Sequence, residues 1–129
     1  MRLRVVTPTR VVVDAETMEV TAPGTEGEFG VLPLHTTFVA SLRPGVLSYQ
    51  DGSQEKQLAV DGGFAEVRDD VVSVLASDAV LPEEVDEKAV QAELDDVRDE
   101  LAEGPESETE TALLLENAER MEARLALVE

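Results

Sequence analysis

The side chains with the greatest chemical potential are the single histidine, His35, and 29 carboxylates. General acid–base catalysis needs paired titratable groups in a pocket that pushes their pKa values apart. His35 has no serine or cysteine at a motif spacing, and most carboxylates fall in predicted turns and helix faces, where they serve solubility. Neither Gly-x-Ser-x-Gly nor a Walker-type phosphate loop occurs. We therefore expect no independent catalytic activity.

Residue types also limit metal and redox chemistry. The chain has no cysteine, which excludes disulfides, thiolate metal sites and a thiol nucleophile. One imidazole is too few for zinc sites that use two or more. We expect no metal site and no required cofactor.

The net charge of −19 is unevenly distributed along the chain. Residues 1–77 hold 11 acidic and 6 basic side chains, whereas residues 78–129 hold 18 and 4. The change near Asp78 marks a predicted domain boundary, with one domain at 1–80 and another at 81–129. Such a surface repels nucleic acid and anionic lipid, so we expect neither as a partner. Eight arginines against two lysines indicate a protein of a salty cytoplasm, with an ordinary acidic mesophilic protein as the alternative.

The chain shows no sign of a membrane span or a signal peptide. No apolar run approaches the ~20 residues that a spanning helix needs. The N-terminus carries Arg2 and Arg4 among its apolar residues and lacks a signal-peptide apolar stretch. We expect a soluble, cytoplasmic chain without direct membrane insertion.

Short apolar runs separated by turn residues fill the first 80 residues. Their spacing of about 8 to 12 residues favours a β-sandwich or barrel over βαβ units. Met18 and Val20 are expected on the inward face of one strand, and Asp51-Gly52 is expected to form a two-residue hairpin turn. The predicted strands cover 2–6, a run from 11, 16–21, 37–42, 46–50, 57–60, 61–67 and 71–76.

Residues 21–45 form the segment around which the sandwich is organised. They include four of the eight glycines, three of the six prolines and His35. We expect this segment to be a shaped loop with short strands, and Arg43-Pro44-Gly45 to separate two strands. Positive φ or tight reversal is predicted at Gly24, Gly27, Gly30 and Gly45.

The pattern becomes helical after Pro82. Two apolar stripes recur at spacings of three and four residues, which predicts two amphipathic helices whose stripes face each other in an antiparallel hairpin. Gly104-Pro105 ends the first helix, since glycine caps it and proline cannot continue it. The stripes are Val90, Leu94, Val97 and Leu101, then Leu114, Ala118, Met121, Leu125 and Val128.

The organising segment resembles the epsilon subunit of the rotary ATP synthase, which carries the loop Ala-Pro-Gly-x-x-Gly-x-x-Gly-x-Leu-Pro-x-His. The resemblance extends to Val6-Thr7-Pro8, to Gly62–Val67, and to the plan of a β-sandwich followed by a helical hairpin. The chain departs from the family at Leu34, where a glycine usually stands. The matching loop positions are Ala22, Pro23, Gly24, Gly27, Gly30, Leu32, Pro33 and His35.

This resemblance implies a non-catalytic rotor subunit of a proton- or sodium-translocating ATP synthase. Such a subunit links the gamma shaft to the ring of c subunits, peripherally on the cytoplasmic face of the cell membrane. The positions that match the family's contact region are Glu28 and His35, shaped by Gly27, Gly30 and Pro33. The alternative for His35 is that it only caps the loop through a backbone hydrogen bond.

The resemblance also implies that the hairpin binds ATP in some members, as a regulatory ligand. Arginine suits phosphate recognition because its donors form a fork. Against this, Glu116 and Arg120 have the spacing of an ordinary helical ion pair, the charge of the region opposes a polyanion, and Asp99 replaces the motif's alanine. The matching residues are Asp95, Arg98, Arg120 and Arg124.

A second implied role is inhibition of ATP hydrolysis, in which an extended hairpin reaches the alpha and beta subunits through basic residues. Because residues 78–129 hold 4 basic side chains against 18 carboxylates, we predict that inhibition is weak or needs high salt. A free-standing ATP-sensing module is the alternative function, and it would bind ATP without gamma. A third option, a salt-adapted β-domain that serves as a scaffold, would bind neither ATP nor gamma.

Overall fold

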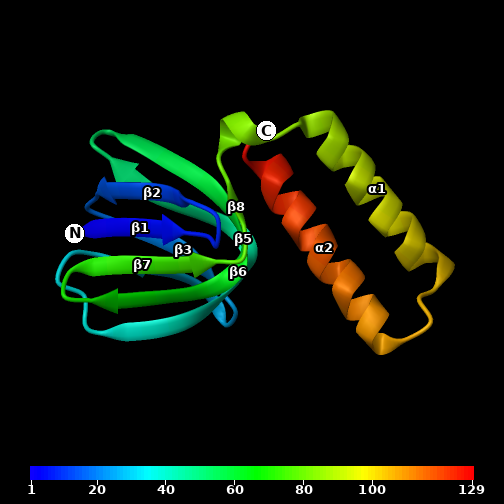
Figure 1. Ribbon diagram of the computed structural model, residues 1–129, viewed down its shortest axis with the longest axis horizontal. Helices are drawn as coiled ribbons and strands as arrows, with labels where there is room; N and C mark the ends of the chain where they lie inside the picture. The colour runs from blue at the N-terminus through cyan, green and yellow to red at the C-terminus, as the bar shows by residue number, and fades with distance from the viewer.

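The computed structural model describes all 129 residues and consists of a β-sandwich with a two-helix hairpin packed at one end (Figure 1). This confirms the predicted fold class. The strands are β1 (Arg2–Val6), β2 (Val11–Glu16), β3 (Val20–Gly24), β4 (Gly27–Val31), β5 (Phe38–Asp51), β6 (Gln54–Arg68), β7 (Val71–Ala76) and β8 (Ala79–Val80). The helices are a 3₁₀ turn (Pro82–Glu84), α1 (Glu87–Glu103) and α2 (Glu108–Ala126).

The strands are hydrogen-bonded in the order β2-β1-β7-β6-β5-β3-β4, and β8 adds to β6. Every pair is antiparallel except β1 with β7. The long strands β5 and β6 stay paired from Phe38–Val67 to Asp51–Gln54 and curve together, so that the sheet folds over an aliphatic core (Figure 1). Leu3, Leu47 and Leu58 are fully buried in that core.

Two strand predictions are wrong. The expected break at Arg43-Pro44-Gly45 lies inside β5, because pairing with β6 keeps the same register on both sides of it. The missing N–H of Pro44 therefore removes one ladder donor without ending the strand. Met18 was expected to face inward but is 69% exposed, because it lies between β2 and β3, whereas Val20 is fully buried.

Of the four loop glycines predicted to need positive φ or tight reversal, only Gly27 has a positive φ, of 129°. Gly24 pairs with Gly27 across a two-residue turn, so its predicted tight reversal is present, and Gly24 and Gly45 are also required by close approach. A Cβ at Gly24 would lie 2.6 Å from the Gly27 carbonyl oxygen, and one at Gly45 would lie 2.7 Å from Cβ of Pro23. Gly30 lies in the regular strand β4 and meets neither condition, so its prediction is wrong.

The turns use residues that tolerate the left-handed region. Asp51 pairs with Gln54, so the predicted Asp51-Gly52 turn is shifted by one residue to Gly52-Ser53, with φ of 62° at Gly52. Between β6 and β7 the turn places Asp69 and Asp70 at φ of 51° and 64°. Aspartate tolerates this conformation better than most residues with a side chain.

Both helices begin at a capping side chain. Asp86 accepts a hydrogen bond from the Ala89 N–H at 3.2 Å, and Ser107 accepts one from the Glu110 N–H at 3.1 Å. Gly104, at φ of 88°, ends α1 as predicted. The helices pack against each other, and α2 makes the main contact with the sandwich, through β5 and β6.

A bidentate ion pair fixes the connector between the sandwich and the hairpin. The Arg10 guanidinium donates two hydrogen bonds of 2.7 Å to the Glu84 carboxylate and a third, of 3.0 Å, to the Ala79 carbonyl. Glu84 also accepts a bond of 2.8 Å from the Leu81 N–H. The guanidinium and this N–H lower the pKa of Glu84 from 4.5 to about 2.

We expect Glu84→Gln to lower the thermal midpoint at pH 7 by about 2–4 °C, a modest effect because the pair is partly exposed. The native pKa is depressed, so the stabilisation is complete above pH 4.5 and is lost as the pH falls to about 2. The variant should therefore lose less stability than the parent over that interval, as measured by thermal melts followed by circular dichroism. Glu83→Gln is the matched control, and identical pH profiles for Glu84→Gln and the parent would contradict the assignment.

Candidate functional site

The structure separates the two predicted contact residues, Glu28 and His35. The loop of His35 lies at the end of the sandwich that carries the N-terminus, opposite the hairpin (Figure 1), because the Leu34 N–H donates to Asp70, which lies 3.5 Å from the N-terminal amine. Glu28 lies in β4 and lines a cavity shared with α2. Of the residues predicted to shape the region, Gly27 begins β4, Gly30 lies within it and Pro33 follows it.

His35 makes the backbone hydrogen bond that was the alternative to a contact role. Its Nδ1–H donates to the Thr36 carbonyl at 2.7 Å, and its ring meets Phe38 edge-on at 5.9 Å between centroids. The side chain nonetheless remains exposed. The bond therefore fixes the loop while leaving the imidazole accessible to a partner.

Leu34 has the most exposed large hydrophobic side chain of the chain, at 88%, and its φ is 65°. This left-handed conformation is unfavourable for a leucine and would suit a glycine better. The Leu34 N–H donates to Asp70 Oδ1 at 2.9 Å, and this bond, with the nearby N-terminal amine, lowers the pKa of Asp70. Met18 and Leu32 are exposed at the same end, at 69% and 59%. We call Met18, Leu32 and Leu34 the apolar tip.

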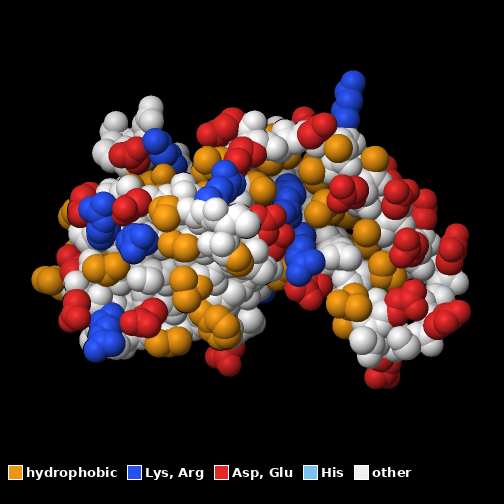
Figure 2. All heavy atoms as spheres, in the orientation of Figure 1, with side chains coloured by type: hydrophobic (Ala, Val, Ile, Leu, Met, Phe, Trp, Pro, Cys, Tyr) orange, Lys and Arg blue, Asp and Glu red, His pale blue; other side chains and the backbone are white.

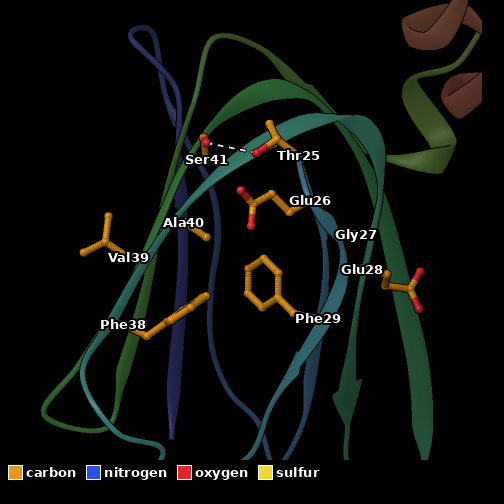
Figure 3. Close-up of a pocket in the computed structure, with 10 residues that line it drawn as sticks. Thr25, Glu26, Gly27, Glu28, Phe29, Phe38, Val39, Ala40 and Ser41 are labelled. Carbon is orange, nitrogen blue, oxygen red and sulfur yellow. Dashed lines mark hydrogen bonds between the residues drawn. The ribbon is translucent and has the colours of Figure 1, made fainter.

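A hollow of about 440 Å³ opens between the β3–β4 hairpin and the start of β5 (Figure 3). The rings of Phe29 and Phe38 meet edge-on across it, with centroids 5.3 Å apart, and Glu26 points toward them. The Thr25 and Ser41 hydroxyls, 3.1 Å apart, close one end. No basic residue lines the hollow, so its chemistry is aromatic and acidic.

A second apolar surface crosses the outer face of four adjacent strands. Phe64 of β6 pairs with Leu75 of β7, Leu75 with Val6 of β1, and Val6 with Val11 of β2. Phe64 and Leu75 are each 60% exposed and Val11 is 52% exposed. We call these four residues the apolar row. Figure 2 shows hydrophobic side chains spread over this face of the sandwich.

Sequence reasoning missed the apolar row, although part of the signal was present. Ala65 and Val67 face the core, so the alternation along β6 places Phe64 on the outer face. The sequence did not show that three other strands bring apolar residues into line with it.

The arginines of the predicted nucleotide site all have carboxylate partners. Arg124 donates to both oxygens of Asp61 at 2.8 and 2.9 Å. Arg120 donates to Glu116 at 2.8 Å, which confirms the expected helical pair.

The two residues of the predicted nucleotide site that lie on α1, Asp95 and Arg98, contact other side chains than Asp61. Arg98 lies 3.6 Å from Glu122, which joins α1 to α2. Asp95 accepts a bond of 3.0 Å from Gln91 on its own helix. A nucleotide would have to displace these partners to gather the four residues.

Comparisons with known proteins agree with this architecture. The family model described as "ATP synthase, Delta/Epsilon chain, beta-sandwich domain" matches residues 1–82. The ATP synthase epsilon chain of Magnetococcus marinus is 40% identical over 127 residues, covering 98% of this chain and 93% of that protein. The epsilon chain of Desulforapulum autotrophicum is 50% identical over 91 residues, covering 70% and 67%.

Solved structures show the same fold. A chain of the Euglena gracilis mitochondrial ATP synthase, in a structure of OSCP, F1 and the c ring, superposes with a TM-score of 0.83 at 28% identity, covering 98% of this chain and 80% of that one. A chain from the Tetrahymena thermophila mitochondrial ATP synthase, at 14% identity and a TM-score of 0.68, covers 99% and 96% and supports the fold. Neither α1 nor α2 has the length and apolarity of a membrane-crossing helix. The chain therefore belongs to the ATP synthase epsilon chain family.

Proposed function

We propose that this chain is a non-catalytic rotor subunit that links the gamma subunit to the c ring of a proton- or sodium-translocating ATP synthase. The observation that carries the proposal is the presence of two separate exposed apolar surfaces, the tip and the row, on a chain of net charge −19. Exposed apolar patches mark interaction sites, and two patches suit a subunit that bridges two partners. The Euglena chain of the same fold lies in an assembly with F1 and the c ring.

The shapes of the two surfaces suggest which partner each one takes. The apolar row lies on a broad face of four strands, which suits the side of a folded gamma subunit. The apolar tip is small, lies opposite the hairpin and includes the loop of His35, which suits the loops of a c ring. Glu28 is exposed on β4 and contributes a rotor contact nearer the hairpin. The subunit would then sit peripherally on the cytoplasmic face of the membrane.

The proposal predicts that the double variant Phe64→Ser, Leu75→Ser binds the host's gamma subunit about tenfold or more weakly, because central apolar side chains dominate interface energetics. Isothermal titration calorimetry with purified gamma would measure this. Leu113→Ser is the control, since Leu113 is 58% exposed but lies on α2.

If the double variant binds gamma as tightly as the parent chain, the apolar row is not the surface that binds gamma. No association of the parent chain, together with ATP binding that Arg124→Ala abolishes, would support the free-standing ATP-sensing module instead.

Leu34→Gly separates the contact role of the tip from its structural role. The isolated chain should not lose thermal stability, because Leu34 is 88% exposed and glycine accepts a φ of 65°. Binding of the chain–gamma complex to detergent-solubilised c rings should fall by about fivefold through loss of the apolar contact. Ser53→Gly, in the turn between β5 and β6, is the control for glycine substitution, and equal binding by Leu34→Gly and the parent would contradict the tip assignment.

The hairpin is the proposed regulatory part, with ATP as its candidate ligand. The proximity of Arg120 and Arg124 to one carboxylate, Asp61, favours an anion site there. The phosphates would have to replace that carboxylate, so ATP binding and the Asp61 contact exclude each other. We also propose that the hairpin can contact the alpha and beta subunits when it regulates ATP hydrolysis.

Removing residues 86–129 should change ATP hydrolysis by the assembled enzyme by no more than about twofold at low salt, since like charges on the hairpin and an acidic partner surface oppose association. The steady-state hydrolysis rate, measured at low and at molar salt, tests this. A many-fold rise on truncation at low salt would show that the acidic hairpin inhibits strongly despite its charge.

A further inference from the structure

The hollow beside the β3–β4 hairpin is shaped by the chain's own hydrogen bonds. The Thr25 N–H donates to the Ser41 carbonyl at 3.0 Å, and the hydroxyl groups of the same two residues lie 3.1 Å apart. These contacts tie the hairpin to β5 at one end of the hollow. Gly24 and Gly27 close the hairpin tightly, since a Cβ at Gly24 would lie 2.6 Å from the Gly27 carbonyl oxygen. The sandwich thus holds open a space of about 440 Å³.

Two phenylalanine rings form the walls of this space. Phe29 of β4 and Phe38 of β5 meet edge-on, with centroids 5.3 Å apart and an angle of 68° between the ring planes. Phe38 is 37% exposed and Phe29 is only partly buried, so both rings border the opening (Figure 3). The face of an aromatic ring carries negative partial charge and attracts cations. A corner between two such rings therefore favours a cation over a neutral group.

The ionised side chains around the hollow carry only negative charge. Glu26 is exposed in the turn between β3 and β4 and points toward the rings (Figure 3). No lysine or arginine lines the hollow, so no basic side chain there neutralises the carboxylate. The net charge of −19 adds a potential that attracts cations to the surface. A cationic ligand therefore finds complementary groups here, whereas an anion finds none.

The lining of the hollow favours one class of cation. A calcium ion would need six or more oxygen ligands, and no group of three or more acidic side chains in the chain is placed to hold a metal. An ammonium group that carries methyl groups has an apolar surface around its charge, so it gains most from contact with aromatic rings. Val39 and Ala40 extend the apolar part of the lining.

We propose that the hollow binds a small quaternary ammonium cation. Phe29 and Phe38 contact the methyl groups, and the Glu26 carboxylate balances the charge. The Thr25 and Ser41 hydroxyls at one end offer hydrogen bonds to a polar substituent, such as the hydroxyl group of choline. The site goes beyond the proposed function, because it lies within one chain and its ligand is neither a rotor subunit nor a nucleotide.

Titration of the isotope-labelled full chain with choline, followed by nuclear magnetic resonance, tests the site. The amide signals of Thr25, Glu26 and Phe38 should shift together and saturate, with a dissociation constant of about 1–10 mM for a partly solvated site. Potassium chloride keeps the ionic strength constant, so that general screening does not change during the titration.

Neohexyl alcohol is the matched control ligand, because a carbon atom replaces the charged nitrogen of choline in an otherwise equal shape. It should bind about tenfold or more weakly, since it lacks the attraction of the charge to the rings and to the carboxylate. Equal affinity for the two ligands would show that the hollow does not select a cation and would overturn the proposal.

Two variants each remove one part of the site. Phe38→Leu keeps an apolar side chain but removes one aromatic face, and Glu26→Gln removes the negative charge at equal side-chain length. Each should weaken choline binding by about fivefold. Glu55→Gln is the matched control: it removes the same charge from an exposed glutamate at the far end of the β5–β6 pair and should leave the affinity within about twofold.

The same spectra verify that the variants are folded, because the amide signals of the fully buried residues Leu3 and Val74 should not move. Should Phe38→Leu disturb them, Glu26→Gln, which lies in an exposed turn, carries the test. Shifts that spread over the acidic surface without saturating, or a Glu26→Gln variant that binds choline as tightly as the parent, would overturn the proposed site.

Discussion

The structure depends on how β6 passes through Gly62 and Gly63. At this point β6 exchanges one neighbour, β8, for another, β7, while it stays paired with β5. A side chain at position 63 would collide with the carbonyl oxygen of Leu75, so only glycine lets β7 approach. The curvature of the sandwich, the alignment of Phe64 with Leu75, and the orientation of Asp61 toward α2 all follow from this passage.

Much of the fold could be predicted because local rules determine it. Gly104-Pro105 ends a helix through conformational preferences that the neighbouring residues do not override. At other positions the prediction was wrong, or gave the wrong reason for the residue, because contacts with a distant segment determine the local structure there. Gly45 is needed where Pro23 packs against the backbone, and Pro44 lies within a strand because β6 keeps its register past it.

The candidate sites depend even more on distant pairing. The motif around His35 is continuous in sequence, so it could be located there, but the left-handed backbone at Leu34 became evident only in the structure. The apolar row needs the register of four strands, which no local pattern supplies. The partner of Arg124 lies 63 residues away, so spacing along the helix suggested only Glu116 for Arg120. Contacts between residues so far apart in the sequence can be identified only from the three-dimensional arrangement of the strands.

The division of the core has a consequence for how the molecule fluctuates and evolves. Because the cluster of 17 buried hydrophobic residues lies entirely within the sandwich, and the helices bury only a few apolar side chains of their own, the hairpin is a separate unit of local stability. Backbone amides of α1 and α2 can exchange with solvent during partial opening, whereas those of the central strands must await global unfolding. Substitutions that change the charge of the helices are accordingly expected to leave the fold of the sandwich intact, because their side chains lie outside its core cluster.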